Sequence, residues 1–351
     1  MRPPAPRQPM PRPTIKTLSE MTGFSIATIS KALRNSPVVT EATRATIAKA
    51  AKEVGYRVSL QGRSLRTGKT YQIAVLMPLS VAPSHEWNGV EHAEILAGIA
   101  AGLEGSPYRL AVHLVRDATD GLAAVQAIVE DQQADGIIFS GILIDDPRVA
   151  FLTAQGFPFV TLGRSRRAGP HAFVDIDSEW AAHAATRRLI EGGHRRIALV
   201  NPDASLAYSA DRINGYSRAL HEAGLPVDSA LIAGGDLTAR FGRSLALALR
   251  QGPDPATGFV CVNESTALGV LSGLHDTGAA IGRDVSVIAY DDINVSAYFQ
   301  PPLTTLFYPL ETLSRMLASF MLRLLAGEPA AALSHFVRPE LVVRQDDRLA
   351  L

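Results

Sequence analysis

Four polar residues stand where apolar segments of the sequence end, and their side chains suit the binding of a small polar ligand. Ser140, Arg164, Asn263 and Asp291 each close a run rich in aliphatic or aromatic residues. Short apolar runs bounded by turn residues predict buried strands. In a parallel sheet the carboxyl ends of the strands lie along one edge, and ligands bind at that edge. We therefore expect these four side chains to converge on a ligand.

The sequence lacks the patterns of the common catalytic centres. It contains no G-x-S-x-G, no H-E-x-x-H and no pair of cysteines, and its nine histidines do not have metal-ligand spacing. Gly68-Lys69-Thr70 resembles the end of a phosphate-binding loop, but that motif requires a glycine where Arg63 stands. His194 lies in a turn before a strand, which favours a structural role. We expect no enzymatic activity, no cofactor and no bound metal.

Apolar runs alternate with amphipathic stretches from residue 71 onward. The expected strands are 73–79, 109–115, 136–141, 157–163, 196–201, 258–263 and 285–291. Stretches at 93–104, 178–193 and 212–224 have the periodicity of amphipathic helices. Strands that alternate with helices predict a parallel sheet with helices on both faces.

The composition indicates a folded chain in a reducing compartment. The length of 351 residues predicts two or three packed units, and 47% hydrophobic residues allow substantial cores. Cys261 is the single cysteine, so no disulfide can form within the chain. No apolar run approaches the roughly 18 residues that span a bilayer. Residues 1–13 lack an apolar stretch, so we expect a flexible tail instead of a secretory signal, and a cytoplasmic location.

The charges are divided unequally along the chain although the net charge is zero. Residues 1–70 contain 13 lysines and arginines against 3 acidic residues, whereas residues 71–351 contain 21 against 31. A basic segment favours contacts with phosphates, and an acidic remainder favours a part that stays off DNA. A mitochondrial-type presequence or a merely solvated basic surface would show the same charge, so the motifs must decide.

Residues 14–56 show three short helical patterns. Thr14, Ser25 and Thr40 are the expected N-caps, because each precedes a helix-forming stretch. Gly23 supplies the left-handed conformation that ends the first helix. The apolar positions expected to face inward are Ile15, Leu18, Met21, Ile29, Leu33, Ile47, Ala50, Ala51 and Val54.

Two helices joined by a tight glycine-containing turn form the helix-turn-helix arrangement, in which the second helix enters the major groove of DNA. The exposed face of that helix carries Ile26, Ala27, Ser30 and Lys31. Lys31 and Ser30 can bond to base edges or phosphates, and Ile26 and Ala27 can contact thymine methyl groups. A three-helix module with another purpose, such as protein interaction, has the same periodicity and stays open on this ground alone.

The segment from Thr14 to Thr70 resembles the head and hinge of the lactose-repressor (LacI/GalR) family of bacterial transcriptional regulators. The likeness is gapless and includes the pattern S-x-x-T-[IV]-S, which begins at Ser25. Lys31 replaces a frequent arginine and gives up bidentate geometry. Arg34 stands where asparagine is usual, which adds a phosphate contact or changes a base preference. The resemblance implies DNA binding by Thr14, Ser25, Ile26, Ala27, Thr28, Ser30, Lys31 and Arg34.

The same resemblance identifies residues 59–65 as a hinge helix that orders when two protomers lie on an operator. Leu65 takes the family's wedge position in the minor groove, where it kinks the duplex. Arg63 is placed for a phosphate contact. Gly62 replaces a usual alanine and costs about 1 kcal/mol of helix propensity, which makes hinge folding more dependent on DNA. A plain interdomain linker is the alternative.

Residues beyond the hinge resemble the sensor domain of that family. The segment 189–216 matches the family's L-x-x-x-G-H-R-x-I-A…R-x-x-G-[YFW] pattern and places Arg212 on its effector-contacting arginine. Asn263 and Asp291 take the positions of the effector-contacting asparagine and aspartate, and Tyr308 takes a pocket-facing position. Arginine, asparagine and aspartate together suit neighbouring sugar hydroxyls, whereas a planar purine would also require aromatic groups on both faces.

Structural interpretations of these residues remain open beside the functional ones. Asp291 can cap the next helix, and Arg212 can form an ion pair. Trp87 can stack on a sugar ring or pack at the edge of a lobe. The order of Arg212, Asn263 and Asp291 in the family's motifs favours the ligand role.

The sequence thus predicts a small all-α helix-turn-helix domain followed by a two-lobed α/β domain like the periplasmic binding proteins. We expect a tail at 1–13, a DNA-binding domain at 14–58, a hinge helix and linker at 59–70, and an effector-binding and dimerisation domain at 71–345. The first lobe is expected at about 71–172 plus 309–334, and the second at about 173–305 plus 335–345.

The expected protein is a nucleoid-associated repressor of carbohydrate uptake or catabolism genes. It binds a near-palindromic double-stranded DNA operator as a homodimer, because two-fold protein symmetry matches two half-sites. No leucine heptad follows the sensor, which favours a dimer over a tetramer. A sugar or sugar derivative between the lobes changes its operator affinity. The alternatives are a secreted sugar-binding protein, which the basic head argues against, and a regulator that responds to a protein partner.

Overall fold

The computed structural model describes residues 13–56, 67–78, 89–166, 169–291, 295–345 and 347–348. They belong to two compact units, Met1–Lys69 and Thr70–Leu351, each of which is described by itself. The predicted hinge residues Gly62, Arg63 and Leu65, together with Trp87, lie outside the described residues. For Asp291 the structure describes the backbone and not the side chain.

The described part of the first unit contains three helices, α1 (Ile15–Thr22), α2 (Ile26–Ala32) and α3 (Glu41–Glu53). All three predicted N-caps are confirmed, because Thr14, Ser25 and Thr40 each accept a hydrogen bond from a backbone N–H three residues further on. Gly23 ends α1 with φ of 73°, in the left-handed region that glycine adopts without strain. The turn between α1 and α2 is therefore as tight as the helix-turn-helix motif requires.

A small apolar core holds these three helices together. It consists of Leu18, Ile29, Ala32, Val39, Ile47, Ala50 and Ala51. Met21 is 49% exposed, so its predicted inward position is wrong. The reason is geometric, since a residue six positions along a helix is rotated by about a third of a turn from the first.

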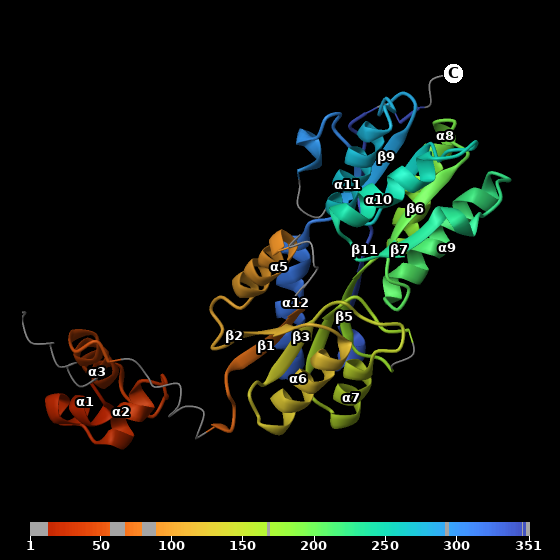
Figure 1. The fold of residues 1–351 in the computed structure, drawn as a ribbon. Coiled ribbons are helices and arrows are strands. Elements are labelled where there is room, and N and C mark those ends of the chain that lie inside the picture. The colour runs from red at the N-terminus through yellow and green to blue at the C-terminus, as the bar shows by residue number, and fades with distance from the viewer. Residues whose placement is uncertain are drawn as a thin grey trace, which may run out of the picture. The chain divides into compact units, whose positions relative to one another are not determined.

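The second unit contains two six-stranded sheets (Figure 1). The first has the order β11-β5-β4-β3-β1-β2, with bounds Ser334–Val337, Ala172–Ile176, Phe159–Leu162, Gly136–Phe139, Gln72–Pro78 and Arg109–Val115. The second has the order β12-β10-β9-β8-β6-β7, with bounds Glu340–Val342, Thr304–Phe307, Ser286–Asp291, Gly258–Cys261, Ile197–Pro202 and Ile232–Gly235. Only β12 is antiparallel to its neighbour among these strands. Each of the seven predicted strands overlaps one of these.

Helices cover both faces of each sheet, as the alternating pattern predicts. On the first sheet, α5 (Gly89–Gly102) and α12 (Leu310–Leu325) share one core, and α6 (Ala118–Glu130) and α7 (Pro147–Gln155) share the other. On the second sheet the corresponding pairs are α8 (Ser178–Glu191) with α9 (Ala207–Glu222), and α10 (Ala239–Arg250) with α11 (Glu264–Asp276). Within the described ranges, no helix has the length and apolar character needed to cross a membrane.

The chain passes between the two sheets after β5, after β10 and after β11. We call residues 70–176 and 310–337 the first lobe, and residues 178–307 and 340–348 the second lobe. The boundaries predicted at about 172 and 334 fall within strands β5 and β11, both of which continue in the first sheet. Val174 pairs with Leu162, and Val337 pairs with Ile176.

Candidate functional site

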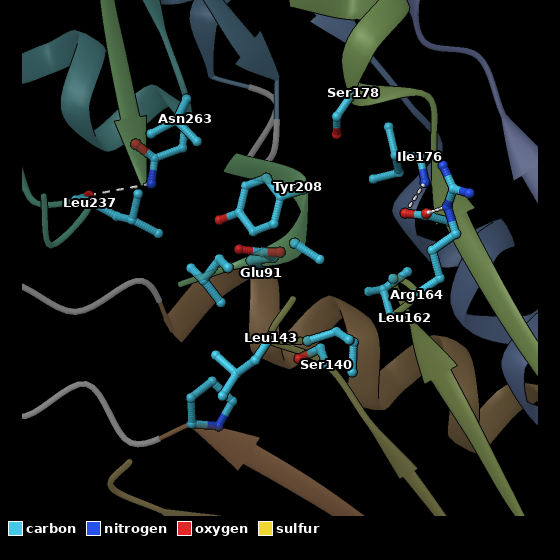
Figure 2. Close-up of a pocket in the computed structure, with 18 of the residues that line it drawn as sticks. Glu91, Ser140, Leu143, Leu162, Arg164, Ile176, Ser178, Tyr208, Leu237 and Asn263 are labelled. Atoms are coloured by element: carbon cyan, nitrogen blue, oxygen red, sulfur yellow. Dashed lines mark hydrogen bonds and ion pairs between the residues drawn. The ribbon is translucent and has the colours of Figure 1, made fainter. Parts of the chain in front are cut away.

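A cavity of about 430 Å³ lies between the carboxyl ends of the two sheets, and both lobes line it (Figure 2). Its volume falls within the range of small-molecule sites. Five of the six predicted effector residues line it, namely Ser140, Arg164, Arg212, Asn263 and Tyr308. The backbone of the sixth, Asp291, ends β9, and its side chain lies outside the described part of the chain.

Arg212 is a buried cation that projects from α9. It is 1% exposed, and its Nε donates to Oδ1 of Asn201 at 2.9 Å. Its guanidinium carbon lies 4.6 Å from the centroid of the Tyr290 ring, a cation–π contact. Neither Nη1 nor Nη2 has a hydrogen-bond partner among the described residues. Because unsatisfied buried donors are costly, these nitrogens favour a ligand that brings acceptor oxygens.

Asn201 holds Arg212 in this orientation and was missed by the sequence prediction. It is the penultimate residue of β6 and is 1% exposed. Its Nδ2 donates to the carbonyl oxygen and Oγ of Ser209 at 3.1 and 2.8 Å, which fixes its amide plane. A signal was available, because Asn201 ends an apolar run just as Asn263 does.

Asn263 has a structural role besides its place in the cavity wall. Its Oδ1 accepts from the Thr266 N–H at 2.8 Å and thereby caps α11. Its Nδ2 donates to the Leu237 carbonyl oxygen at 3.3 Å, an interaction drawn in Figure 2. Among the described residues one amide hydrogen of Asn263 has no partner and can donate to a ligand, since an amide nitrogen carries two donors.

Ser140 belongs to a loop of the first lobe that a buried ion pair stabilises. Arg148 donates to both carboxylate oxygens of Asp146, at 3.0 and 2.6 Å, and to the Gly141 carbonyl oxygen at 2.8 Å. Asp146 also accepts from the Leu143 N–H at 3.0 Å. Arg148 and Asp146 are at most 5% exposed, so the loop that follows β3 is held from inside the lobe.

Arg164 is paired within the first lobe. Its Nε donates to Oδ2 of Asp175 at 3.0 Å, and its guanidinium lies 4.7 Å from the ring centroid of Phe336. Burial raises the pKa of Asp175 to about 6, although Arg164 acts in the opposite direction. Figure 2 shows Arg164 at the side of the cavity. Arg164 therefore helps to shape the wall, with Asp175 as its partner.

The cavity has further polar and aromatic residues that the sequence prediction did not include. Tyr208 from α9 and Glu91 from α5 are directed into the same space (Figure 2). Burial, together with the carboxylate of Glu94, raises the pKa of Glu91 to about 7. Tyr290 and Tyr308 lie edge to face, with ring centroids 6.3 Å apart. Glu91 is near no strand end, so the rule that found Asn263 did not apply to it.

The charges of the wall favour an uncharged polar ligand over an anion. The acidic lining residues are Glu91, Asp117, Asp175, Asp211 and Asp236, and the basic ones are Arg116, Arg148, Arg164 and Arg212. Three of these four arginines are already paired with aspartates. Two of the five carboxylates are paired as well, Asp175 with Arg164 and Asp211 with Arg166. The remaining charged groups and the tyrosine hydroxyls offer both donors and acceptors, which is what a ligand with many hydroxyls requires.

The single cysteine of the chain has an unreactive thiol. Among the described residues, no group of three His, Cys, Asp or Glu side chains is arranged to hold a metal ion. Cys261 is buried, and burial raises the pKa of its thiol to about 12. Since the thiolate is the nucleophilic form, this cysteine is unreactive at neutral pH.

The candidate DNA-binding residues divide into exposed and structural ones. Ile26 is 50% exposed, and Ala27 and Lys31 are also exposed, so all three can reach a base edge. The hydroxyl groups of Ser25 and Thr28 lie 2.9 Å apart within the N-cap of α2.

Two predicted phosphate or base contacts have local partners. Arg34 Nε donates to the Ser30 carbonyl oxygen at 2.8 Å, which folds the side chain back along α2. Thr14 caps α1 through a hydrogen bond from the Thr17 N–H. The exposed face of α2 is therefore formed mainly by Ile26, Ala27 and Lys31.

A helix-turn-helix head joined to a two-lobed body with a cavity between the lobes defines a ligand-responsive, DNA-binding regulator. Residues 14–59 match the family described as bacterial regulatory proteins, lacI family. Residues 186–345 match the periplasmic binding protein-like domain. The head and the body thus match the two modules that the sequence analysis predicted.

Similarity to whole proteins supports the same assignment. The chain is 33% identical to the HTH-type transcriptional regulator AglR of Rhizobium meliloti (strain 1021) over 339 residues, 94% of this chain and 93% of that protein. The structure of the transcriptional regulator CelR in complex with cellobiose is 27% identical, with a TM-score of 0.71, over 95% of this chain and 100% of that one. The operator-bound lac repressor dimer is 22% identical, with a TM-score of 0.83, over 96% of this chain and 100% of that one. This similarity shows that the two proteins share a fold. The chain belongs to the LacI family and is a DNA-binding transcriptional regulator.

Proposed function

We propose that this protein is an operator-binding homodimer that represses genes for carbohydrate uptake or catabolism, and that an uncharged sugar bound between its lobes changes its operator affinity. The proposed effector contacts are Ser140, Arg164, Arg212, Asn263, Asp291 and Tyr308. The proposed DNA contacts are Thr14, Ser25, Ile26, Ala27, Thr28, Ser30, Lys31, Arg34, Arg63 and Leu65. The protein acts at the nucleoid, because its operator lies there.

The observation that carries this proposal is the buried guanidinium of Arg212, a residue of the cavity wall whose Nη1 and Nη2 have no acceptor among the described residues. A fully buried guanidinium is unfavourable unless something accepts from it. A sugar supplies hydroxyl oxygens that accept from Arg212 and hydroxyl hydrogens that donate to the surrounding carboxylates. The complex of the relative CelR with cellobiose supports this class of ligand.

The test combines ligand binding with operator binding. The full-length protein is screened by thermal shift against glucose, maltose, cellobiose, sucrose and glucose 6-phosphate, because binding to the folded state raises the melting temperature. Operator fragments selected from random DNA by the same protein are then titrated with and without each hit. We expect a neutral saccharide to raise the melting temperature and to shift operator affinity.

Two results would contradict the proposal. A shift with glucose 6-phosphate alone would contradict the uncharged effector. If no saccharide acts and a bacterial protein captured on the body changes operator affinity, the input is a protein partner. Both results leave the DNA-binding assignment in place.

A further inference from the structure

One acidic side chain of the cavity wall has no partner within the described part of the chain. Five acidic residues line the cavity, and four of them are held in place by ion pairs or local hydrogen bonds: Asp117, Asp175, Asp211 and Asp236. The fifth is Glu91, whose carboxyl oxygens accept no hydrogen bond from a described residue and pair with no described cation. Both of its oxygens can therefore accept from a ligand.

Glu91 projects into the cavity from the start of α5. It is the third residue of that helix, which begins at Gly89, and its side chain is partly exposed. Figure 2 shows the carboxyl group directed into the same space as Tyr208, which belongs to the second lobe. The free N–H groups in the first turn of a helix favour a carboxylate there. This position keeps the ionised form of Glu91 accessible although its surroundings shield it from water.

The empty cavity favours the protonated form of Glu91. Burial disfavours the carboxylate, and the charge of Glu94, three residues further along α5, adds repulsion. Together they raise the pKa of Glu91 to about 7, so roughly half of the molecules carry this proton at neutral pH. No described group donates to the carboxylate, so the proton is what neutralises it.

A sugar hydroxyl can replace that proton. A hydroxyl that donates to a carboxylate forms a charge-assisted hydrogen bond, which is shorter and roughly twice as strong as a bond between neutral groups. An ionised carboxyl group can accept from two hydroxyls at once, one on each oxygen, whereas a protonated one keeps a hydrogen on one oxygen. The effector and the proton therefore compete for the same oxygens of Glu91.

The other charged and titratable groups of the described wall act on Glu91 less than burial and Glu94 do. Burial lowers the pKa of His92, so its imidazole adds no charge near neutral pH. Asp175 has a pKa of about 6, but it is paired with Arg164. The remaining described groups that face the cavity are Arg116 and Asp117 after β2, Arg148 on α7, Tyr208, Asp211 and Arg212 on α9, Asp236 after β7, Tyr290 on β9 and Tyr308 after β10.

We propose that Glu91 is an effector contact that makes the response to the effector depend on pH: its carboxylate accepts hydrogen bonds from sugar hydroxyls, and binding releases the proton that Glu91 carries in the empty cavity. The protein then senses a given concentration of sugar more weakly as its surroundings become more acidic. This inference rests on the proposed function of the cavity. The two can fail separately, because binding of a saccharide and release of a proton are measured independently.

Isothermal titration calorimetry on the full-length protein tests the link between effector and proton. Glucose, maltose, cellobiose and sucrose are each titrated at pH 6 and at pH 8. For a saccharide that binds, we expect Kd to be up to about tenfold lower at pH 8, because the ionised fraction of Glu91 rises from about a tenth to about nine tenths. Glu91→Gln removes the titrating group and is expected to bind more weakly, with equal Kd at both pH values.

Glu104→Gln is the matched control. It removes an exposed carboxyl group that follows the end of α5 and does not line the cavity. It is expected to keep the pH dependence of the parent. A dependence that persists unchanged in Glu91→Gln would belong to another group, such as Asp175, and would overturn the role of Glu91.

Proton release can also be measured without any substitution, so the test stands even if Glu91→Gln does not fold. The titration at pH 7 is repeated in two buffers with different enthalpies of ionisation, and the difference in observed heat gives the number of protons released. We expect the release of about half a proton per chain, as a pKa of about 7 in the empty cavity implies. Uptake of a proton, or no exchange of protons, would overturn the proposal.

The outcomes distinguish this inference from the proposed function. Binding of a saccharide with the same Kd at pH 6 and pH 8 would refute the role of Glu91 and leave the proposed function in place. If none of the four saccharides binds at either pH, the proposed function fails and this inference fails with it.

Discussion

Oδ1 of Asn201 accepts a hydrogen bond from Nε of Arg212 at 2.9 Å, and both side chains are 1% exposed. This bond, with the Tyr290 ring against the guanidinium, leaves Nη1 and Nη2 buried and without an acceptor among the described residues. Asn201 is therefore a positioning residue for Arg212.

Two substitutions at this pair should have unequal effects on the free energy of unfolding. Arg212→Met removes a buried charge at similar volume, so we expect the free energy of unfolding to stay within about 1 kcal/mol of the parent while the effector response is lost. Asn201→Leu leaves the cation without its partner and should destabilise by about 2 kcal/mol. Urea denaturation followed by fluorescence measures both. A larger loss of stability in Arg212→Met than in Asn201→Leu would show that Arg212 is structural.

The stability of the protein should fall as the pH rises through the pKa of Glu91. The pKa of Glu91 is raised to about 7 by burial and by Glu94, so the folded state binds this proton more tightly than the unfolded state does. The resulting stabilisation is complete below about pH 4.5 and is lost as the pH rises through 7. Glu91→Gln should flatten the dependence of the melting temperature on pH between 5 and 8. An unchanged slope in that variant would assign the dependence to other groups, such as Asp175 with its pKa near 6.

Gly215 should tolerate no side chain, because a Cβ built there lies 2.0 Å from the Glu179 carbonyl oxygen. Gly215→Ala must push α9 away from α8, with an expected loss of about 1–3 kcal/mol in stability and a displacement of Arg212 one turn earlier. Asn214→Ala, an exposed neighbour, is the control and should be nearly neutral. Calorimetry of both variants measures the difference. Equal melting temperatures would contradict the close approach of the two helices.

Lys31 should contribute a salt-dependent contact with DNA. It is exposed in the last turn of α2, so Lys31→Ala should lower the slope of log K against log salt by about one for each head. Lys49→Ala removes the same charge from the exposed face of α3 and should change the slope less. Fluorescence anisotropy on a labelled operator between low and moderate salt gives both slopes. Equal slopes for the two variants would show that Lys31 makes no direct contact with the DNA.

Leu65 should separate specific from nonspecific binding. If it wedges into the minor groove of a central base step, Leu65→Ala weakens operator binding by a few kcal/mol because the kinked duplex is no longer stabilised. Binding to nonspecific DNA depends on phosphates and should change little. Titration of the variant against both DNAs checks this. Losses of the same size on both would refute the wedge.

The sequence predicted the elements with strong local signals. The run at 109–115 is β2 to the residue, and the caps Thr14, Ser25 and Thr40 are all present, because period and capping are local properties. Strands β7, β10 and β12 of the second sheet were not predicted. β7 contains two glycines, and β10 and β12 have only four and three residues, so their local signals are weak. These strands form because neighbouring strands are already in place.

The binding residues also divide into those with a local sequence signal and those without one. Asn263 and Ser140 could be predicted, since they follow apolar runs. Glu91 and Tyr208 enter the cavity wall because lobes formed from distant segments meet there, and no local pattern carries that information. The start of α9 at Ala207 was placed too late, at 212, because no side chain caps it.

The three passages between the lobes also determine when the protein can finish folding. The first lobe begins with β1 at Gln72 but needs α12 and β11, which end at Val337. On the ribosome the head, whose contacts are local, can fold as soon as residue 56 has emerged, whereas neither lobe is complete until almost the whole chain has been made. A chain that ends after β9 would therefore contain a folded DNA-binding head without a complete effector-binding domain. The C-terminal segments are thus the last part that must be synthesised before the regulator can respond to an effector.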